Sequence, residues 1–336
     1  MTPRCLKIFV LAQIIFSASI HGQTFQKTPV HFLPQRLADG VYACTHVFGG
    51  EATCNAGVIN MGSYTVVIDP FLSPKAAEEL QQWILDIKLP AVKYVINTHY
   101  HNDHVRGNQV FNSDVQIIAT RKTATLIAEE EPKAIAAESQ YAAPLCKRFT
   151  KLTHDYSGDV KAREFQVYKM MQPYFCALAR SKEEIKTRIP DLLFEEELVL
   201  QGSRKLIVRD MGMGHTQSDA VVVLPDDEII FGSDLITNTF HPYLPDGDPI
   251  NWLQILGRLN SLSISIVVPG HGETGNRDLI QTTMNYLDEI IQAANKIKQI
   301  GTSMQLKQAF EMPEKYREWW LDQFYDQNMA FLLKKD

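Results

Sequence analysis

The chain lacks three features, and each absence removes a class of protein. Its formal net charge is −6 over 336 residues, so it has no excess of positive charge with which to bind nucleic acid. The body of the chain contains no run of about 18 or more apolar residues, so we expect no membrane span there. None of its five cysteines has the spacing of a metal site. What is present is a hydrophobic content of 45%, enough for one sizeable core or at most two.

The first 22 residues differ from the rest and are predicted to be a signal peptide. Arg4 and Lys7 precede a short apolar stretch at residues 8–18, and small and polar residues follow as far as Gly22. This pattern is typical of a secretory signal, whereas the apolar stretch is short for the alternative, an N-terminal membrane anchor. We therefore expect a periplasmic or secreted protein with no membrane span after cleavage.

Removal of that segment would leave four cysteines in an oxidising compartment, where disulfides form. Cys44 and Cys54 flank a predicted hairpin turn and could lie opposite one another. Cys146 and Cys176 would then pair by elimination. Four buried free thiols fit the sequence as well, so the pairing stays open.

Four residues with metal-binding side chains occur within six consecutive positions, at His99, His101, Asp103 and His104. The β-branched, apolar residues 92–97 before them predict a buried strand. Side chains alternate along an extended chain, so His99 and His101 point to one side, and the following turn can bring Asp103 and His104 beside them. Crowded imidazoles are costly to bury without partners, which disfavours a purely structural role. The pattern indicates ligands for two adjacent metal ions, with zinc the metal that such ligands suit.

The same design recurs later in the chain, where apolar strands each deliver one such residue. Strands are predicted at residues 206–210, 228–234 and 264–268, and they lead to His215, Asp234 and His271. Adjacent glycines allow close approach of the backbone. A Gly-His or Ser-Asp dipeptide alone is a weak signal. Because these dipeptides follow the cluster at His99–His104 in this order, the set as a whole is a strong signal.

The flanking regions predict sheets with helices outside them. Short strands at residues 41–43, 55–61 and 64–69 form an antiparallel meander, and residues 73–88 have helical spacing. Asp69 ends the last of these strands. It either starts a turn or orients a metal-bound histidine.

Residues 121–195 show little strand pattern and much charge. Helices are predicted at residues 123–138 and 180–189, and His154 is interpreted as a surface residue. The segment has the character of an insertion that either shapes access to the site or is an inert elaboration. After His271 a long amphipathic helix is predicted at residues 277–300.

One or two further helices are predicted within residues 306–332. Five aromatic residues there, spaced as on a helix, are interpreted as packing residues: Tyr316, Trp319, Trp320, Phe324 and Tyr325.

The H-x-H-x-D-H motif at residues 99–104 resembles the signature of the metallo-β-lactamase superfamily. The resemblance extends over residues 40–275, apart from the insertion. It implies an α/β (α+β) fold, an αββα sandwich with a largely helical insertion, in one domain over residues 23–336. It also implies a small-molecule substrate and two Zn²⁺ per chain, with iron or manganese left open. The residues that match the first metal's ligands are His99, His101 and His215, those of the second are Asp103, His104 and His271, and Asp234 matches the bridging carboxylate.

That resemblance implies a hydrolase in which a hydroxide held between two metals attacks an acyl bond. Asp103 would also orient the hydroxide or receive its proton. Asp69, Thr216 and Asp219 are candidates to support the ligands from behind.

Position 234 bears on the substrate. Broad-spectrum zinc β-lactamases typically have a cysteine there and a lysine three residues later, whereas this chain has Asp234 and Thr237. Aspartate resembles the glyoxalase II, lactonase and quinoprotein-associated hydrolases, which favours an ester, thioester, lactone or related bond. A zinc β-lactamase is the alternative, because the surrounding sequence is close to the lactamases. His241 and Tyr243 follow in a loop that either contacts substrate or is an ordinary surface loop.

Two rivals from other classes are an iron-dependent oxidoreductase of the same fold and a metal-loaded binding protein. The complete second set of ligands disfavours the first, and the absence of any substituted ligand disfavours the second.

Overall fold

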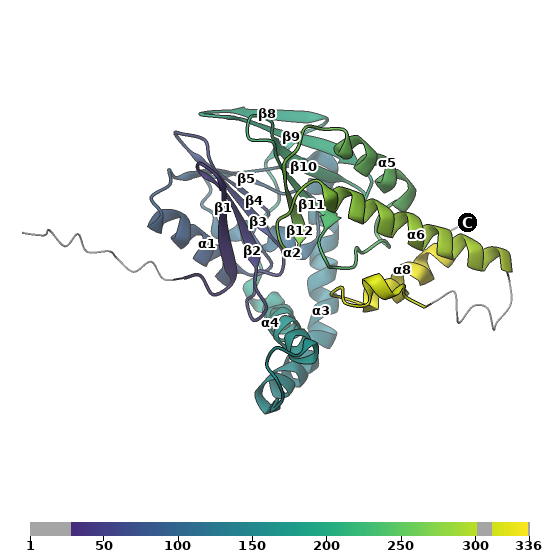
Figure 1. Cartoon of the computed structure of the whole chain (residues 1–336). Helices are drawn as coiled ribbons and strands as arrows, with labels where there is room; N and C mark the ends of the chain where they lie inside the picture. The colour runs from purple at the N-terminus through teal and green to yellow at the C-terminus, as the bar shows by residue number, and fades with distance from the viewer. Residues whose placement is uncertain (1–27, 301–310, 335–336) are drawn as a thin grey trace, which may run out of the picture.

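Two β-sheets packed face to face form the centre of the protein, and helices cover their outer faces (Figure 1). The computed structural model describes residues 28–300 and 311–334, so the predicted signal peptide lies outside the described residues. No helix within these two ranges is long and apolar enough to cross a membrane.

The first sheet has seven strands in the order of the chain, antiparallel from β1 to β4 and parallel from β4 to β7. The strands are β1 (Phe32–Ala38), β2 (Val41–His46), β3 (Ala56–Asn60), β4 (Thr65–Ile68), β5 (Val92–Ile96), β6 (Gln116–Thr120) and β7 (Leu192–Phe194).

The second sheet has five strands in the order β12-β11-β10-β9-β8, all antiparallel except for the parallel pair β11 and β12. The strands are β8 (Glu197–Gln201), β9 (Lys205–Gly212), β10 (Asp219–Leu224), β11 (Ile229–Thr237) and β12 (Ile266–His271).

Helices and short 3-10 turns connect the strands. They are α1 (Pro74–Asp86), α2 (Asn102–Val105), η1 (Arg106–Val110), α3 (Arg121–Asp155), α4 (Arg163–Glu184), α5 (Pro249–Asn260), α6 (Asp278–Ile300), η2 (Glu314–Tyr316) and α8 (Gln323–Lys334).

Three apolar layers hold the sandwich together, because both faces of each sheet are covered. Between the sheets, side chains such as Ile59 and Val222 interdigitate. On the outer face of the first sheet, Leu80 and Trp83 of α1 pack against its strands. On the outer face of the second sheet, Trp252 of α5 joins a core with α6. This α-β-β-α layering confirms the predicted fold.

Helices α3 and α4 form a hairpin that projects from one end of the sandwich (Figure 1). Sequence patterns underestimated both helices. The helix predicted at residues 123–138 extends in the structure to Asp155, past Pro144, a residue type that normally disfavours a helix interior. The prediction for residues 180–189 was wrong beyond Glu184, where α4 ends.

The cysteines form one of the two bridges that the sequence allowed. Cys146 of α3 and Cys176 of α4 form a disulfide, which joins the two helices of the hairpin. Cys44 and Cys54 are buried and free. Their bridge does not form because Cys44 lies opposite Ala56 in the register of β2 and β3, and the Cys54 thiol donates instead to the Asp103 carbonyl at 2.9 Å.

Candidate metal centre

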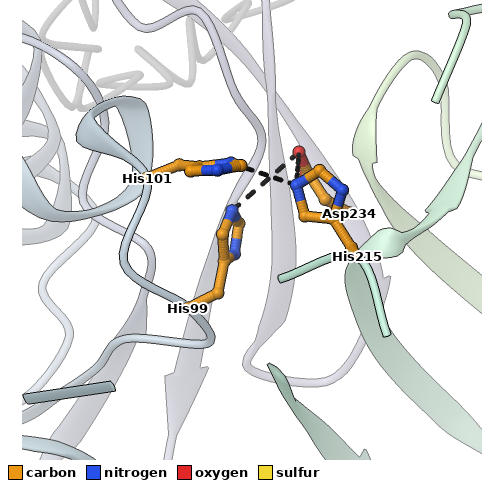
Figure 2. Close-up of side chains that lie close together, drawn as sticks. All are labelled: His99, His101, His215 and Asp234. Carbon is orange, nitrogen blue, oxygen red and sulfur yellow. Dashed lines mark hydrogen bonds and ion pairs between the residues drawn. The ribbon is translucent and has the colours of Figure 1, made fainter. Parts of the chain in front are cut away.

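The seven side chains that the sequence proposed as ligands converge at one end of the sandwich, where strands of both sheets finish. Figure 2 shows four of them pointing toward one another. Strand ends and the short segments that follow them carry most of the set, because parallel strands deliver their carboxyl ends to one edge. His99 and His101 follow β5, Asp103 and His104 lie in α2, His215 lies between β9 and β10, Asp234 lies in β11, and His271 ends β12.

The ligand atoms fall into two neighbouring groups. One consists of His99, His101, His215 and Asp234, and the other of Asp103, His104 and His271, and within each group these atoms lie within 4.8 Å of one another. Asp234 lies between the two groups. Its Oδ2 is 3.4 Å from His215 Nε2 and 3.3 Å from His271 Nε2, and its Oδ1 is 3.3 Å from His104 Nε2. The carboxylate is therefore placed where a bridge between two ions would be.

Unpaired buried atoms show that these residues fit metal ions. His99 Nε2, His104 Nε2 and Asp234 Oδ1 are buried and have no hydrogen-bond partner. Leaving such atoms unpaired costs free energy, so natural proteins rarely bury them without a partner. Imidazole nitrogen and carboxylate oxygen are ligands that zinc accepts. A pair of divalent ions would satisfy all three atoms at once.

Two imidazoles and the carboxylate of the first group have protonation states that suit metal binding. Burial lowers the pKa of His99 well below its usual range and that of His215 to about 3, so both imidazoles are neutral at pH 7. Burial acts to raise the pKa of Asp234, but His271 and His104 outweigh it and hold that pKa well below its usual range. His99 and His215 therefore present neutral nitrogens beside an ionised carboxylate.

Backbone carbonyls fix the orientation of two ligand rings. His215 Nδ1 donates to the Tyr243 carbonyl and His271 Nδ1 donates to the Thr53 carbonyl, each at 3.0 Å. A proton held on Nδ1 leaves Nε2 with its lone pair toward the centre. Neither carbonyl has a signature in the sequence, because any residue can supply it.

Asp69 orients His104 and joins the two sheets. Its Oδ2 is 2.9 Å from His104 Nδ1 and also accepts from the hydroxyls of Thr98, at 2.7 Å, and Ser233, at 3.1 Å. Its Oδ1 accepts from the Thr98 amide at 2.9 Å. The side chain is buried directly after β4, so the structure places it in the position that the sequence proposed.

Thr216 and Asp219 shape the loop that carries His215. The Asp219 carboxylate accepts from the amides of Gly214 and Thr216 and from the Thr216 hydroxyl, at 2.7–3.1 Å. Burial raises the pKa of Asp219 to about 7, while these donors favour its charged form. Both residues act on the backbone of the loop, and neither side chain forms a hydrogen bond with a ligand ring.

Sequence reasoning missed Asp246, which lies in the loop before α5. Its Oδ2 is 3.0 Å from His101 Nε2, and His101 Nδ1 in turn lies 3.0 Å from His215 Nε2. Asp246 therefore orients His101 as Asp69 orients His104. An aspartate beside Gly247 is also what a turn needs, so nothing in the sequence distinguished it.

A cavity of about 520 Å³ opens above the ligands. Its walls are largely aromatic and thioether side chains from α3, α4, α8 and the loops near β2 and β11. Residues 121–195 thus form part of the wall, which supports the interpretation that they shape access. The wall residues include Phe48, Tyr141, Met170, Met171, Tyr174, Phe175, Phe240, Tyr243 and Phe324.

Two interpretations of aromatic and loop residues need correction. His241 is buried away from the described cavity lining, with Nδ1 3.0 Å from the Tyr286 hydroxyl and Nε2 3.1 Å from the Tyr316 carbonyl, so the predicted substrate contact is wrong. Tyr243 does line the cavity, where its contact with substrate stays a prediction. Tyr316 is packed as expected, but Phe324 lines the cavity instead. Packing residues and cavity-lining residues have the same helical spacing in the sequence, so the pattern could not distinguish them.

Comparison with known proteins agrees with this geometry. The family model of the metallo-β-lactamase superfamily matches residues 49–271. The chain belongs to the metallo-β-lactamase superfamily. The family that the H-x-H-x-D-H motif suggested is therefore confirmed.

Relatives in the superfamily are distant. The chain is 21% identical over 299 residues to the metallo-β-lactamase type 2 of Bacteroides fragilis, covering 86% of this chain and 98% of the relative. It is 25% identical over 249 residues to that of Bacillus cereus, covering 71% and 75%.

Solved structures show the same fold. A metallo-β-lactamase from Pontibacter korlensis superposes with a TM-score of 0.55 at 22% identity, covering 76% of this chain and 99% of that one. The DIM-1 metallo-β-lactamase gives 0.54 at 17% identity, covering 77% and 97%.

Proposed function

We propose that this chain is a hydrolase that uses two metal ions, most simply zinc, to cleave an acyl bond of a small molecule. The bond would be an ester, thioester, lactone or related linkage. The observation that carries the proposal is the convergence of five imidazoles and two carboxylates on facing atoms, below a cavity of about 520 Å³.

When bound, the metal pair would supply a nucleophilic hydroxide at neutral pH and a Lewis acid for the substrate carbonyl. The residues of the chain hold that centre in place. His99, His101 and His215 would hold one ion, Asp103, His104 and His271 would hold the other, and Asp234 lies between the two groups.

Asp103 is the residue best placed to move a proton. It lines the cavity, and its Oδ2 is 3.5 Å from His271 Nε2 and 3.7 Å from His104 Nε2. Its side chain is 17% exposed, so the carboxylate meets the solvent of the cavity as well as the ligands. A carboxylate there can orient the attacking oxygen and receive its proton as the acyl bond is attacked.

A zinc β-lactamase is the second candidate, favoured because the two relatives above carry the name metallo-β-lactamase type 2. Against it stand Asp234 in place of cysteine and Thr237 in place of lysine. Thr237 is buried and its hydroxyl donates to the Phe240 carbonyl, so it offers no contact for a drug carboxylate.

We further propose that the protein is exported. The Cys146–Cys176 disulfide supports this, because such bridges persist in oxidising compartments. Fractionation of cells that make the full chain tests it: the mature protein is expected outside the cytoplasm without residues 1–22, and a cytoplasmic protein that retains them would contradict it.

The experiment for the activity combines metal analysis with a substrate panel. Purified protein should contain about two zinc per chain and should hydrolyse a simple thioester, an aryl ester or a lactone, with loss of activity on chelation and recovery on addition of zinc. Rapid cleavage of a chromogenic cephalosporin would favour the β-lactamase. One iron per chain without hydrolysis would refute both hydrolase proposals.

A further inference from the structure

The cavity above the metal ligands has no lysine or arginine side chain in its described lining. Its only acidic residues are Asp103 and Asp234, which belong to the floor with the ligand histidines. The remaining polar side chains in the walls are neutral amides, hydroxyls and the imidazole of His46.

Two arginines near the cavity are already engaged by other partners. Arg106 is buried and forms ion pairs with Glu131 and Glu138 of α3, so its charge is satisfied inside the protein. Arg163 lies over the Trp320 ring, 4.6 Å from its centroid, and donates to backbone carbonyls. Neither guanidinium lines the cavity.

The walls instead offer large apolar surfaces from two separate helices. Met170, Met171 and Phe175 come from α4, and Phe324 comes from α8. Phe324 is held against the Tyr243 ring, with centroids 5.1 Å apart. Thioether and aromatic side chains adapt to and bury apolar groups, and they give no hydrogen bond to a carboxylate.

We propose that the substrate is uncharged in the part remote from the scissile bond and carries there an aromatic or aliphatic group that lies between α4 and α8. This inference rests on the proposed hydrolase and names its substrate class: neutral esters, thioesters or lactones with an apolar acyl group. A carboxylate at that place would lose its water without gaining a cation, which is costly.

Two esters of the same length and leaving group test the inference. They are 4-nitrophenyl hexanoate, which is neutral, and the mono-4-nitrophenyl ester of adipate, which ends in a carboxylate. We expect kcat/KM for the hexanoate ester to be at least about tenfold higher, because the adipate carboxylate would lose its water without gaining a cation. A tenfold ratio corresponds to about 1.4 kcal/mol of free energy. Equal values, or a preference for the adipate ester, would overturn the inference while leaving the hydrolase intact.

A charge introduced into the wall should reduce the preference for the neutral ester. Gln327 is an exposed cavity residue on α8, so Gln327→Lys changes the charge of the wall without touching the core. The variant should raise kcat/KM for the adipate ester by several-fold relative to that for the hexanoate ester, and an unchanged ratio would count against the inference. Gln82→Lys on α1 adds the same charge on the outer face of the first sheet and should change neither.

Lys169 provides the strongest challenge to the inference. Its side chain lies outside the described lining, but its Cε would be 3.2 Å from a Cβ placed on Gly49, next to the cavity residue Gly50. If an adipate preference is found and Lys169→Met abolishes it, this lysine recruits anions and the inference fails.

Binding separates this inference from the proposed activity. Calorimetry with hexananilide and with the monoanilide of adipic acid, both resistant to cleavage, measures affinity whether or not esters are hydrolysed. Tighter binding of the neutral anilide, weakened about tenfold by Phe324→Ala, supports the inference even if the protein hydrolyses no acyl bond. Binding of the adipate anilide alone would refute it.

Discussion

Replacement of Asp69 by asparagine should weaken the second metal site without disturbing the fold. Asp69 has a φ of 50°, a left-handed conformation that asparagine adopts as readily as aspartate. The asparagine carbonyl can still accept from the Thr98 amide, which lies 2.9 Å from Oδ1. The backbone at the end of β4 should therefore stay as it is.

The change acts on the tautomer of His104. In the wild type Oδ2 of Asp69 is 2.9 Å from His104 Nδ1 and accepts its proton. An amide nitrogen at that place donates instead, so Nδ1 must accept and the proton moves to Nε2, the atom that faces Asp234. A protonated Nε2 cannot bind a metal. Loss of such an orienting partner typically lowers metal affinity 10- to 100-fold, equivalent to about 1.4–2.8 kcal/mol.

Competition with a chromophoric zinc chelator measures both affinities in Asp69→Asn. The matched control is Asp246→Asn, because Asp246 orients His101 but its side chain is 38% exposed, so water can replace the lost contact. We expect only a few-fold effect in the control. Unchanged zinc affinities in Asp69→Asn, or a larger loss in Asp246→Asn than in Asp69→Asn, would show that the tautomer argument is wrong.

Three further changes test the site and its support. Asp234→Ala removes the carboxylate between the two groups and should lower metal content below two per chain and turnover sharply; full occupancy with full activity would refute the bridging role. Arg106→Met leaves two buried carboxylates without their cation. It should lower the free energy of unfolding, measured with urea, by about 3–5 kcal/mol. Its control, Arg121→Ala, breaks an exposed pair and should cost less than about 1 kcal/mol; equal costs would contradict the reasoning. His241 is buried with a pKa lowered to about 4, chiefly by burial. The neutral ring's contribution to the free energy of unfolding is therefore fully present above about pH 6.5 and is lost as pH falls toward 4. The full loss is about 3 kcal/mol. The stability difference between the wild type and His241→Gln, measured in chelator, should shrink over that range, and a constant difference would exclude the titration.

The sequence predicted the strands that end at the metal centre because their pattern is local. Residues 92–97 are β-branched and apolar, and β5 occupies Val92–Ile96. The ligand residues stand directly after such runs, so strand prediction and ligand prediction supported each other. The edge strand β1 was missed because its residues are partly exposed and it includes Pro34.

What the sequence could not predict depends on contacts between distant segments. Asp246 orients a histidine 145 positions away, and Phe324 enters the cavity from a helix more than 200 positions beyond His99. The two cysteine pairs show the same limit. Cys44 and Cys54 are close in sequence, but strand register keeps them from bonding, whereas Cys146 and Cys176 meet because two long helices pack side by side.

Metal binding and substrate choice are carried by different parts of this protein. The ligands come from strand ends and short loops that the buried Asp69, Thr98 and Ser233 network ties to both sheets. Much of the cavity wall comes from α4, which lies in the hairpin that projects from the sandwich, and from α8, which packs against α6 (Figure 1). A substitution at Phe324 can therefore alter which molecule fits while leaving the seven ligands in place. Relatives near 20–25% identity need not share the side chains of these helices, so the name of a relative does not carry over to the substrate of this chain.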